Sequence, residues 1–201
     1  DACARGFSIA IHAIGNAAVD QAIDTLAQVR ARHPDTPPPR IEHACFVTPE
    51  AARRAGDAGI AVVSQPAFVA LPTFHELPIP HGLRLLAHRT LLEAGVRVAG
   101  SSDAPVTGFD PLLAMRRAVD RRSIRGRPLQ IDEAISPGQA LAMYTREAAY
   151  VSGCLEQTGT LEPGKRADIV VLSNDPLVAL EEAAVERTIV AGRVMYQVRE
   201  M

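Results

Sequence analysis

The sequence predicts an α/β fold in which parallel strands alternate with helices, followed by a short β-rich tail. Short apolar runs alternate with segments whose apolar residues recur at helical spacing. Four such strand–helix units follow one another, and each helix provides the crossover that parallel pairing requires. An eight-unit barrel takes roughly 250 residues, so the first ~125 residues cover about four units. We therefore expect half of a (β/α)8 TIM-like barrel.

The expected strands are short apolar runs, and the helices between them carry recognisable start signals. Asn16 is placed to cap the first helix, and Thr48 and Asp110 each precede a proline in the first helical turn. Ser136 and Gln139 have the spacing of a capping box. Strands are expected at residues 7–12, 40–44, 60–65 and 96–100. Helices are expected at residues 16–29, 49–58, 83–93, 111–119 and 137–151.

The character of the sequence changes after about residue 155. Short strand signals separated by turns follow at residues 159–161, 168–172, 188–190 and 194–196. We therefore divide the chain into a partial barrel, residues 1–155, and a C-terminal segment of a small β-domain, residues 156–201. Strand-like sequence begins almost directly after Asp1, so we expect the natural beginning of the protein to lie elsewhere.

Composition argues against several classes of protein. The formal net charge of -2, without a cluster of Lys and Arg, argues against nucleic-acid binding. No apolar run approaches the ~20 residues that span a bilayer, and no secretory signal is visible. The cysteines Cys3, Cys45 and Cys154 are scattered and odd in number, which argues against a disulfide framework. We expect a cytoplasmic protein without membrane or nucleic-acid partners.

Three candidate metal ligands stand at matching places in the predicted units. His12 ends the first strand, His43 ends the second, and Asp103 follows the fourth. The carboxyl ends of barrel strands converge on one face, where active sites form, and imidazole and carboxylate groups suit divalent metals. Each residue alone is a weak signal, because a strand-end histidine is more often a hydrogen-bonded side chain and Asp103 equally fits a turn or cap. Because all three stand at equivalent strand ends, a metal site and these structural roles fit the sequence about equally well.

Further polar residues lie in and near the long third connection. Gln65 ends the third strand, and His75 and His81 lie in the connection itself. Long loops of this kind often form lids or substrate-binding elements, so we expect these three residues to contact substrate. A capping or loop role for Gln65 fits the sequence as well. Each of these histidines, and His88 after them, is most simply a solvated residue.

Two sets of charged residues have structural explanations. Glu42 points away from His43 if the segment is a strand, so we expect it to form an ion pair with Arg40. The arginines of the fourth helix are expected to form a solvated face: Arg116, Arg117, Arg121 and Arg122.

Five stretches of the chain follow one another in a specific order and spacing. Four of them are His12–Asn16, Arg40–Ala44, Ser64–Pro66 and Gly100–Val106, and the fifth is Gly159–Leu172 in the tail. The first four resemble the motifs of the amidohydrolase superfamily, most closely its family 3 branch, which includes N-acyl amino acid deacylases and exoenzyme-regulatory-type proteins. The fifth is similar to the stretch that leads into the superfamily's small β-sandwich domain. The resemblance covers essentially the whole chain.

The resemblance implies a role for each part of the chain. Residues 1–155 would hold about strands five to eight of the barrel, and residues 156–201 the C-terminal strands of the β-sandwich. His12 and His43 would be the metal ligands on strands five and six. Asp103 would follow strand eight as a metal ligand and as the catalytic base and then acid, beside zinc bound as one or two ions. The family's His-x-His pair and bridging Lys belong to earlier strands.

Three positions depart from the family pattern. Asn16 stands where the family often has Asp, Ala17 where it often has Arg, and Phe68 where it usually has His. These departures leave metal binding possible and concern substrate recognition. The substrate class therefore stays open among acyl amino acids, cyclic amides and simple amidines.

We expect a metal-dependent hydrolase that cleaves a small-molecule, amide-type substrate at a C–N bond other than a peptide bond, using metal-activated water. The alternative is a non-catalytic or regulatory amidohydrolase-like module that needs a partner half. A phosphate-handling barrel is disfavoured, because residues 100–103 place an acid where a Gly-rich loop would cradle phosphate. The open edges of a half barrel favour self-association or pairing with the missing N-terminal half.

Overall fold

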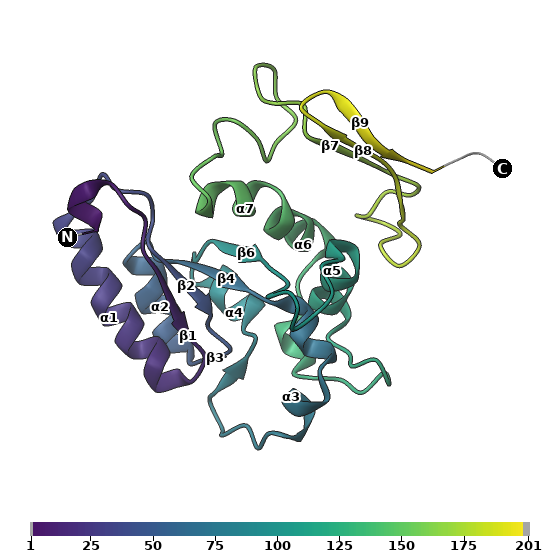
Figure 1. The fold of residues 1–201 in the computed structure, drawn as a ribbon. Helices are drawn as coiled ribbons and strands as arrows, with labels where there is room; N and C mark the ends of the chain where they lie inside the picture. Colours follow the sequence, from purple (N-terminus) through teal and green to yellow (C-terminus); the bar gives the residue numbers. More distant parts are fainter. Residues whose placement is uncertain (1, 199–201) are drawn as a thin grey trace.

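A sheet of four parallel strands forms the centre of the molecule in the computed structural model, which describes residues 2–198 (Figure 1). The strands lie side by side in chain order: β1 (Ala10–Ala13), β2 (Arg40–His43), β4 (Ala61–Ser64) and β6 (Val98–Gly100). All three pairings between them are parallel. The predicted α/β class, with a parallel sheet built from successive strand–helix units, is confirmed.

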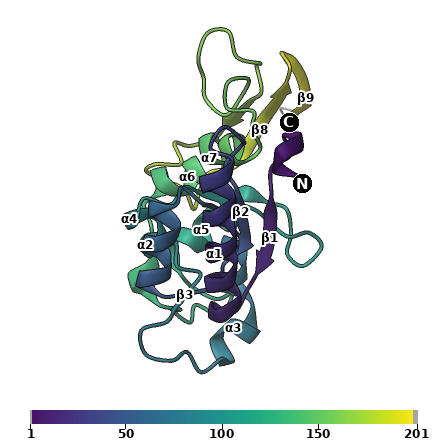
Figure 2. The same ribbon diagram turned by 90° about the vertical axis from the view of Figure 1, so that its left-hand side faces the viewer.

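Three helices that connect these strands pack together along the sheet. They are α1 (Asn16–Arg32), α2 (Pro49–Asp57) and α4 (His88–Glu93). Helix α1 contacts β1 and β2, α4 contacts β6, and α2 lies between the two helices. Figure 2 shows α1 and α2 next to each other on this side of the molecule.

The two faces of the sheet carry different clusters, because alternate strand residues point to opposite sides. Ile41, Val62 and Val98 join Leu26 of α1 in the main hydrophobic core, which the three connecting helices cover. Each of these four side chains is at most 1% exposed, so their burial is a major source of the stability of this unit. This packing fixes the positions of the strand ends.

The opposite face of the sheet carries a smaller cluster. Val63 and Ala99 pack there with α7 (Arg146–Val151). The expected ion pair between Arg40 and Glu42 also forms on β2, with 2.7 Å between Arg40 Nε and Glu42 Oε1. The same guanidinium donates to the last carbonyl of α7 at 3.2 Å, which ties the helix to the sheet.

The remaining elements of the barrel-like part are short. Strands β3 and β5 pair in an antiparallel manner, and α5 packs against η2 and α6. The elements are η1 (Cys3–Arg5), β3 (Phe46–Val47), η2 (Pro66–Ala70), α3 (Pro72–Glu76), β5 (Arg84–Leu85), α5 (Pro111–Asp120), η3 (Ile131–Glu133) and α6 (Pro137–Tyr144). Within residues 2–198, no helix has the length and apolar character needed to cross a bilayer.

Most of the predicted helix caps are present. Thr48 and Asp110 accept hydrogen bonds from backbone N–H groups in the first turns of α2 and α5, and Ser136 forms a complete capping box at α6. The predicted cap at Asn16 is wrong. Gly15 takes the N-cap position with an extended backbone, so Asn16 becomes the first helical residue and its side chain does not cap α1.

Two predicted helices are interrupted. Residues 83–93 divide into β5 and α4, because Leu86 adopts a left-handed backbone (φ 48°) that a continuous helix cannot accommodate. The carbonyl of Leu86 accepts a hydrogen bond from Arg121 instead, at 3.0 Å. The helix expected over 137–151 divides into α6 and α7 at Thr145, whose φ and ψ of -124° and -96° are not helical.

We predicted that Arg121 belongs to a solvated helix face, and this prediction is wrong, because Arg121 is fully buried. Its guanidinium donates to the carbonyls of Leu129, Leu86 and Leu85 at 3.1, 3.0 and 2.8 Å. Burial lowers the pKa of Arg121 to about 10, against the opposing effect of nearby acidic groups. Three carbonyls from two separate segments thus accept hydrogen bonds from one side chain, which holds both segments at the end of α5.

The C-terminal part forms a separate antiparallel sheet of β7 (Ile169–Leu172), β8 (Val185–Val190) and β9 (Arg193–Gln197). Figure 1 shows it beyond α6, on the far side of the molecule from α1. The strand signal at 159–161 is wrong, because these residues form a bend and loop. Apolar side chains stand exposed on the small sheet: Val170, Val190, Val194, Met195 and Tyr196.

Candidate metal centre

His12 and His43 come together at the carboxyl ends of β1 and β2. Their ring centroids are 4.5 Å apart and their planes meet at 76°, so the two rings are in an edge-to-face arrangement. His12 is exposed and His43 is 8% exposed, so the pair lies where the sheet meets solvent. Two of the three predicted metal ligands are therefore neighbours in space, although 26 residues of helix and loop, 14–39, separate their strands in the chain.

An unusual backbone conformation at His43 allows the two rings to meet. His12 is in register with Glu42, and His43 is in register with Ala13, so alternation alone would place the two histidines on opposite faces. His43 instead has a φ of 79° and Ala44 a φ of 46°, and this left-handed turn reverses the direction of the His43 side chain. The N–H of Ala44 donates to the Ala13 carbonyl at 2.9 Å and holds the turn. Such conformations in non-glycine residues cost free energy and cluster at functional sites.

The ring of His43 has close neighbours from the next strand along the sheet. Its Nδ1 atom lies 2.9 Å from Oε1 of Gln65, which directly follows β4 and is 1% exposed. The ring of Phe68 lies nearly parallel to that of His43, at 15° and 6.4 Å between centroids. The imidazole is thus oriented by an amide at one edge and an aromatic ring beside its face.

Asp103 follows β6 in an exposed turn with a left-handed backbone (φ 52°). Its N–H donates to Ser101 Oγ at 3.3 Å, which stabilises the turn. Burial and, as the smaller cause, the negative charge of Asp103 together raise the pKa of the Cys45 thiol to about 12. Asp103 therefore acts electrostatically on the segment that follows His43, and both lie at the same end of the sheet.

The structure does not gather Asp103 into one cluster with the two histidines. Among residues 2–198 no three His, Cys, Asp or Glu side chains lie close enough together to hold a metal ion. The order of strands explains this, because β1 and β6 form opposite edges of the sheet, three spacings of about 4.8 Å apart. His12 and Asp103 can approach a common centre only if the sheet curves into a barrel.

The other predicted site residues differ in their surroundings. His75 is half-buried, and its Nε2 lies 2.7 Å from the carbonyl oxygen of Val69, while His81 is exposed. We predicted that His88 is a solvated residue, and this prediction is wrong. It is fully buried, its Nε2 lies 3.0 Å from Ser64 Oγ, and burial with the charge of Arg121 lowers its pKa to about 3. His88 therefore has a structural role beneath the strand ends.

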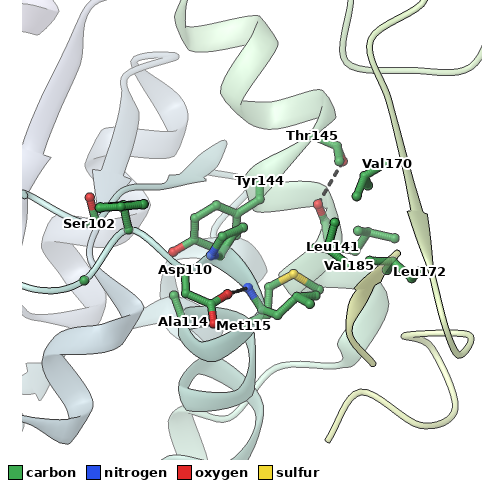
Figure 3. A pocket seen from close by; sticks show the side chains of 14 residues that line it. Ser102, Asp110, Ala114, Met115, Leu141, Tyr144, Thr145, Val170, Leu172 and Val185 are labelled. Atoms are coloured by element: carbon green, nitrogen blue, oxygen red, sulfur yellow. Dashed lines mark hydrogen bonds between the residues drawn. The ribbon is translucent and has the colours of Figure 1, made fainter. Parts of the chain in front are cut away.

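A cavity that the sequence did not reveal lies between α5, α6 and the strands β7 and β8 (Figure 3). Its volume is about 360 Å³, and its walls are mostly apolar, with Ser102, Asp110, Tyr144 and Thr145 as polar members. The buried hydroxyl of Tyr144 has no hydrogen-bond partner in the described part of the chain, and burial raises the pKa of this phenol. His12 and His43 do not line this cavity, so it is separate from the histidine pair.

One sequence signal for the cavity wall is Gly100 at the end of β6. A Cβ atom at this position would lie 2.4 Å from Cζ of Tyr144, so only glycine allows the ring to pack there. We expect Gly100→Ala to lower the free energy of unfolding by about 1–3 kcal/mol through overpacking. Urea denaturation of the purified protein measures this change.

Gly108→Ala is the matched control, because Gly108 lies in the loop that follows β6 and a Cβ there meets nothing within 4 Å. We expect it to leave stability nearly unchanged. Tyr144→Leu should remove most of the penalty when combined with Gly100→Ala, since the two positions are in contact. Equal stability of the wild type and Gly100→Ala would contradict the packing shown here.

The donor groups of the histidine pair suit a metal of the zinc type. Imidazole nitrogen is a preferred ligand of such metals, and a hydrogen bond at the second ring nitrogen, as His43 has, is typical of histidine ligands. A catalytic zinc usually has three protein ligands, and this chain brings two together. The residues present therefore fit part of a metal centre, to which Asp103 and further groups would have to be added.

Comparison with known proteins identifies the family of the chain. The family model described as amidohydrolase family matches residues 2–196. The chain is 36% identical over 201 residues to the N-substituted formamide deformylase of Arthrobacter pascens, covering 96% of this chain and 37% of that protein. It also matches the putative amidohydrolase YtcJ of Bacillus subtilis (strain 168) at 29% identity, covering 96% of this chain and 38% of that protein. The chain thus spans a little over a third of the length of these curated relatives.

Solved structures share the fold. A crystal structure of an uncharacterized metal-dependent hydrolase from Pyrococcus horikoshii OT3 aligns with a TM-score of 0.75 and 29% identity, covering 89% of this chain and 36% of that one. The extent of the family match, the identity to the deformylase and the shared parallel sheet lead to one conclusion: this chain belongs to the amidohydrolase family, and within it to the family 3 branch.

Proposed function

We propose that this chain provides the ligands His12 and His43 to the metal centre of a hydrolase that acts on C–N bonds other than peptide bonds. The observation that carries the proposal is the contact of the two imidazole rings at the carboxyl ends of adjacent parallel strands. That end of the strands is where (β/α)8 barrels assemble their active sites. The whole protein would perform the reaction, with this chain as about strands five to eight of its barrel and the C-terminal strands of a small β-sandwich.

Asp103 is the third ligand and the proton-transfer group of the proposed centre. When bound there, a divalent metal would supply Lewis-acid chemistry, activating water and polarising the scissile carbonyl. The Asp103 carboxylate takes a proton from the attacking water and passes it to the nitrogen of the leaving amine. Curvature of the sheet into a closed barrel would bring this carboxylate and the histidine pair to a common centre.

The relatives support this chemistry. The deformylase of Arthrobacter pascens is named for N-substituted formamides, whose deformylation breaks an amide C–N bond. The Pyrococcus horikoshii structure is described as a metal-dependent hydrolase. A more distant structure with the same fold, the atrazine chlorohydrolase TrzN of Arthrobacter aurescens TC1, was crystallised with zinc. We therefore propose zinc, as one or two ions, and place N-substituted formamides beside acyl amino acids as the first substrates to test.

The proposed partner of this chain is the first half of the barrel. Within the described residues β1 and β6 each pair with a single strand, so each leaves an edge that can accept another. Strands that close the barrel would cover both edges. We expect the chain produced alone to self-associate through them, and a monodisperse, cooperatively melting monomer in size-exclusion chromatography and calorimetry would contradict this expectation.

The second candidate function is a non-catalytic or regulatory module of the same fold. The observation that favours it is that the part of the chain described by the structure does not assemble three metal-binding side chains. The sequence upstream in the natural gene separates the candidates. An apolar strand ending in His-x-His, and a later strand ending in Lys, would support the enzyme, while their absence would support the module.

Zinc binding is expected to depend on both histidines. In the full natural protein, His12→Ala and His43→Ala should each lower zinc affinity by at least ~100-fold, because each removes a ligand from the centre. Zinc content after dialysis, measured by plasma mass spectrometry, checks this. The control His33→Ala changes a histidine at the end of α1 and should retain wild-type zinc. Equal zinc content in all four proteins would rule out the ligand assignment, and zinc binding without hydrolysis of any amide tested would favour the non-catalytic module.

A further inference from the structure

Gln65 occupies a position between the sheet and the histidine pair. It directly follows β4, which pairs with β2 in parallel, so its side chain lies beside the end of β2. The amide is 1% exposed and both of its ends have partners inside the protein. Oε1 lies 2.9 Å from Nδ1 of His43, and Nε2 donates to the carbonyl of Val63 at 3.3 Å.

The hydrogen-bond partners determine which way the amide of Gln65 faces. The carbonyl of Val63 can only accept a hydrogen bond, so the NH2 group of the amide must face it. The amide oxygen is then left to face His43. The reverse orientation would set oxygen against oxygen at Val63, in a buried place where a lost hydrogen bond costs free energy.

The orientation of the amide in turn determines the proton position on His43. The amide oxygen can only accept a hydrogen bond, so Nδ1 of His43 must be the protonated nitrogen that donates it. A neutral imidazole has one protonated nitrogen, and Nε2 therefore keeps its lone pair. A metal binds only an unprotonated ring nitrogen, so this is the tautomer in which Nε2 can act as a ligand.

We infer that Gln65 is a positioning residue that holds His43 in the Nδ1-protonated tautomer and presents Nε2 as the metal-binding atom. This inference rests on the proposed function. It assigns Gln65 to contact with the metal ligand His43 and not, as we expected from the sequence, with substrate. Two aromatic rings limit rotation of the His43 imidazole about its side-chain bonds. The ring of Phe68 lies beside its face, and the ring of His12 meets it edge to face. Hydrogen bonds of this kind orient metal-binding histidines and raise their basicity.

The test compares Gln65→Met with Gln65→Glu in the full natural protein. Methionine matches the length of glutamine but offers no oxygen to Nδ1, whereas glutamate keeps an oxygen acceptor at that position. We expect Gln65→Met to lower zinc affinity by about 10–100-fold, the range seen when the hydrogen-bond partner of a ligand is removed. Gln65→Glu should retain more affinity than Gln65→Met, because glutamate still accepts from Nδ1 although its second oxygen faces the Val63 carbonyl. Competition with a zinc-binding dye measures both affinities.

The proton position is read directly and without metal. Histidine labelled with 15N in the chelator-treated protein gives separate NMR signals for protonated and unprotonated ring nitrogens, and His43→Asn identifies the signals of His43. We expect a protonated Nδ1 in the wild type and in Gln65→Glu, and loss of that preference in Gln65→Met. Ser64→Ala is the matched control, since it removes the neighbouring bond to His88 and leaves Gln65 in place.

The possible outcomes separate this inference from the proposed function. A protonated Nε2 in the wild type, or a Gln65→Met protein with the wild-type tautomer and zinc affinity, would overturn the positioning role. An effect of Ser64→Ala as large as that of Gln65→Met would also overturn it, because general disturbance of the core would then explain both. Absence of zinc binding in the wild type would overturn the proposed function, while the NMR signals would still decide the tautomer.

Discussion

Replacement of Arg121 by methionine is expected to lower the free energy of unfolding by about 3–5 kcal/mol. The guanidinium donates to three buried carbonyls, from Leu85, Leu86 and Leu129, and methionine of similar length removes all three of these hydrogen bonds. The Leu86 carbonyl then keeps its hydrogen bond from the His88 N–H. Each lost partner of a buried carbonyl costs about 1–3 kcal/mol. The buried Glu133 also loses a nearby positive charge. Urea denaturation followed by circular dichroism measures the change.

Arg122→Met is the matched control for this experiment. Arg122 is the next residue and is exposed, so its replacement should change stability by less than about 0.5 kcal/mol. Arg121→Lys should fall between the two variants, because an ammonium group keeps the charge but cannot reach three carbonyls in the fixed geometry of a guanidinium. An Arg121→Met protein as stable as Arg122→Met would show that the buried guanidinium is dispensable.

Asp103→Asn in the full natural protein is expected to reduce kcat for amide hydrolysis by about 10²–10⁴-fold. Asparagine preserves size and an oxygen ligand, but it cannot accept the proton of the attacking water. Zinc content should therefore change little while turnover falls. Steady-state kinetics on N-substituted formamides and acyl amino acids, together with metal analysis of the same samples, measure both quantities.

The control for this substitution is Asp35→Asn, which changes an exposed aspartate in the loop after α1. It should leave kcat and zinc content as in the wild type. Unchanged turnover in Asp103→Asn would remove Asp103 from the proton-transfer role. Loss of zinc together with turnover would instead show that its main contribution is as a ligand.

The parts of the fold that could be predicted depend on local signals. Thr48 and Asp110 each stand before a proline, and Ser136 is followed three residues later by glutamine, so the caps of α2, α5 and α6 follow from short stretches of sequence. The parallel order of the four strands follows from the helices between them. At Asn16 the same reasoning placed the N-cap of α1 one residue too late, because Gly15 adopts the extended backbone of the cap.

The features that could not be predicted depend on contacts between distant segments. Leu86 interrupts a predicted helix with a left-handed backbone, and its carbonyl accepts from Arg121, 35 residues away; neither residue alone signals this. For the candidate site, the strand ends predicted that His12 and His43 would be close. The left-handed turn at His43, which allows the rings to meet, has no signal in the sequence, because non-glycine residues seldom adopt it.

The contact between His12 and His43 lies within a single β–α–β unit, residues 10–43. The register of β1 and β2 brings the two strand ends together, and the left-handed turn at His43 and Ala44 directs the His43 ring toward His12. The pair can therefore be transferred to another protein as one continuous segment. A circular permutant, a split protein or a chimera of two barrels inherits both imidazoles and the turn that brings them together as long as its junction falls outside residues 10–44. The contacts of His43 with Gln65 and Phe68 come from the segment that follows β4. Recombination between related genes could exchange half-barrels on either side of the pair without having to rebuild it.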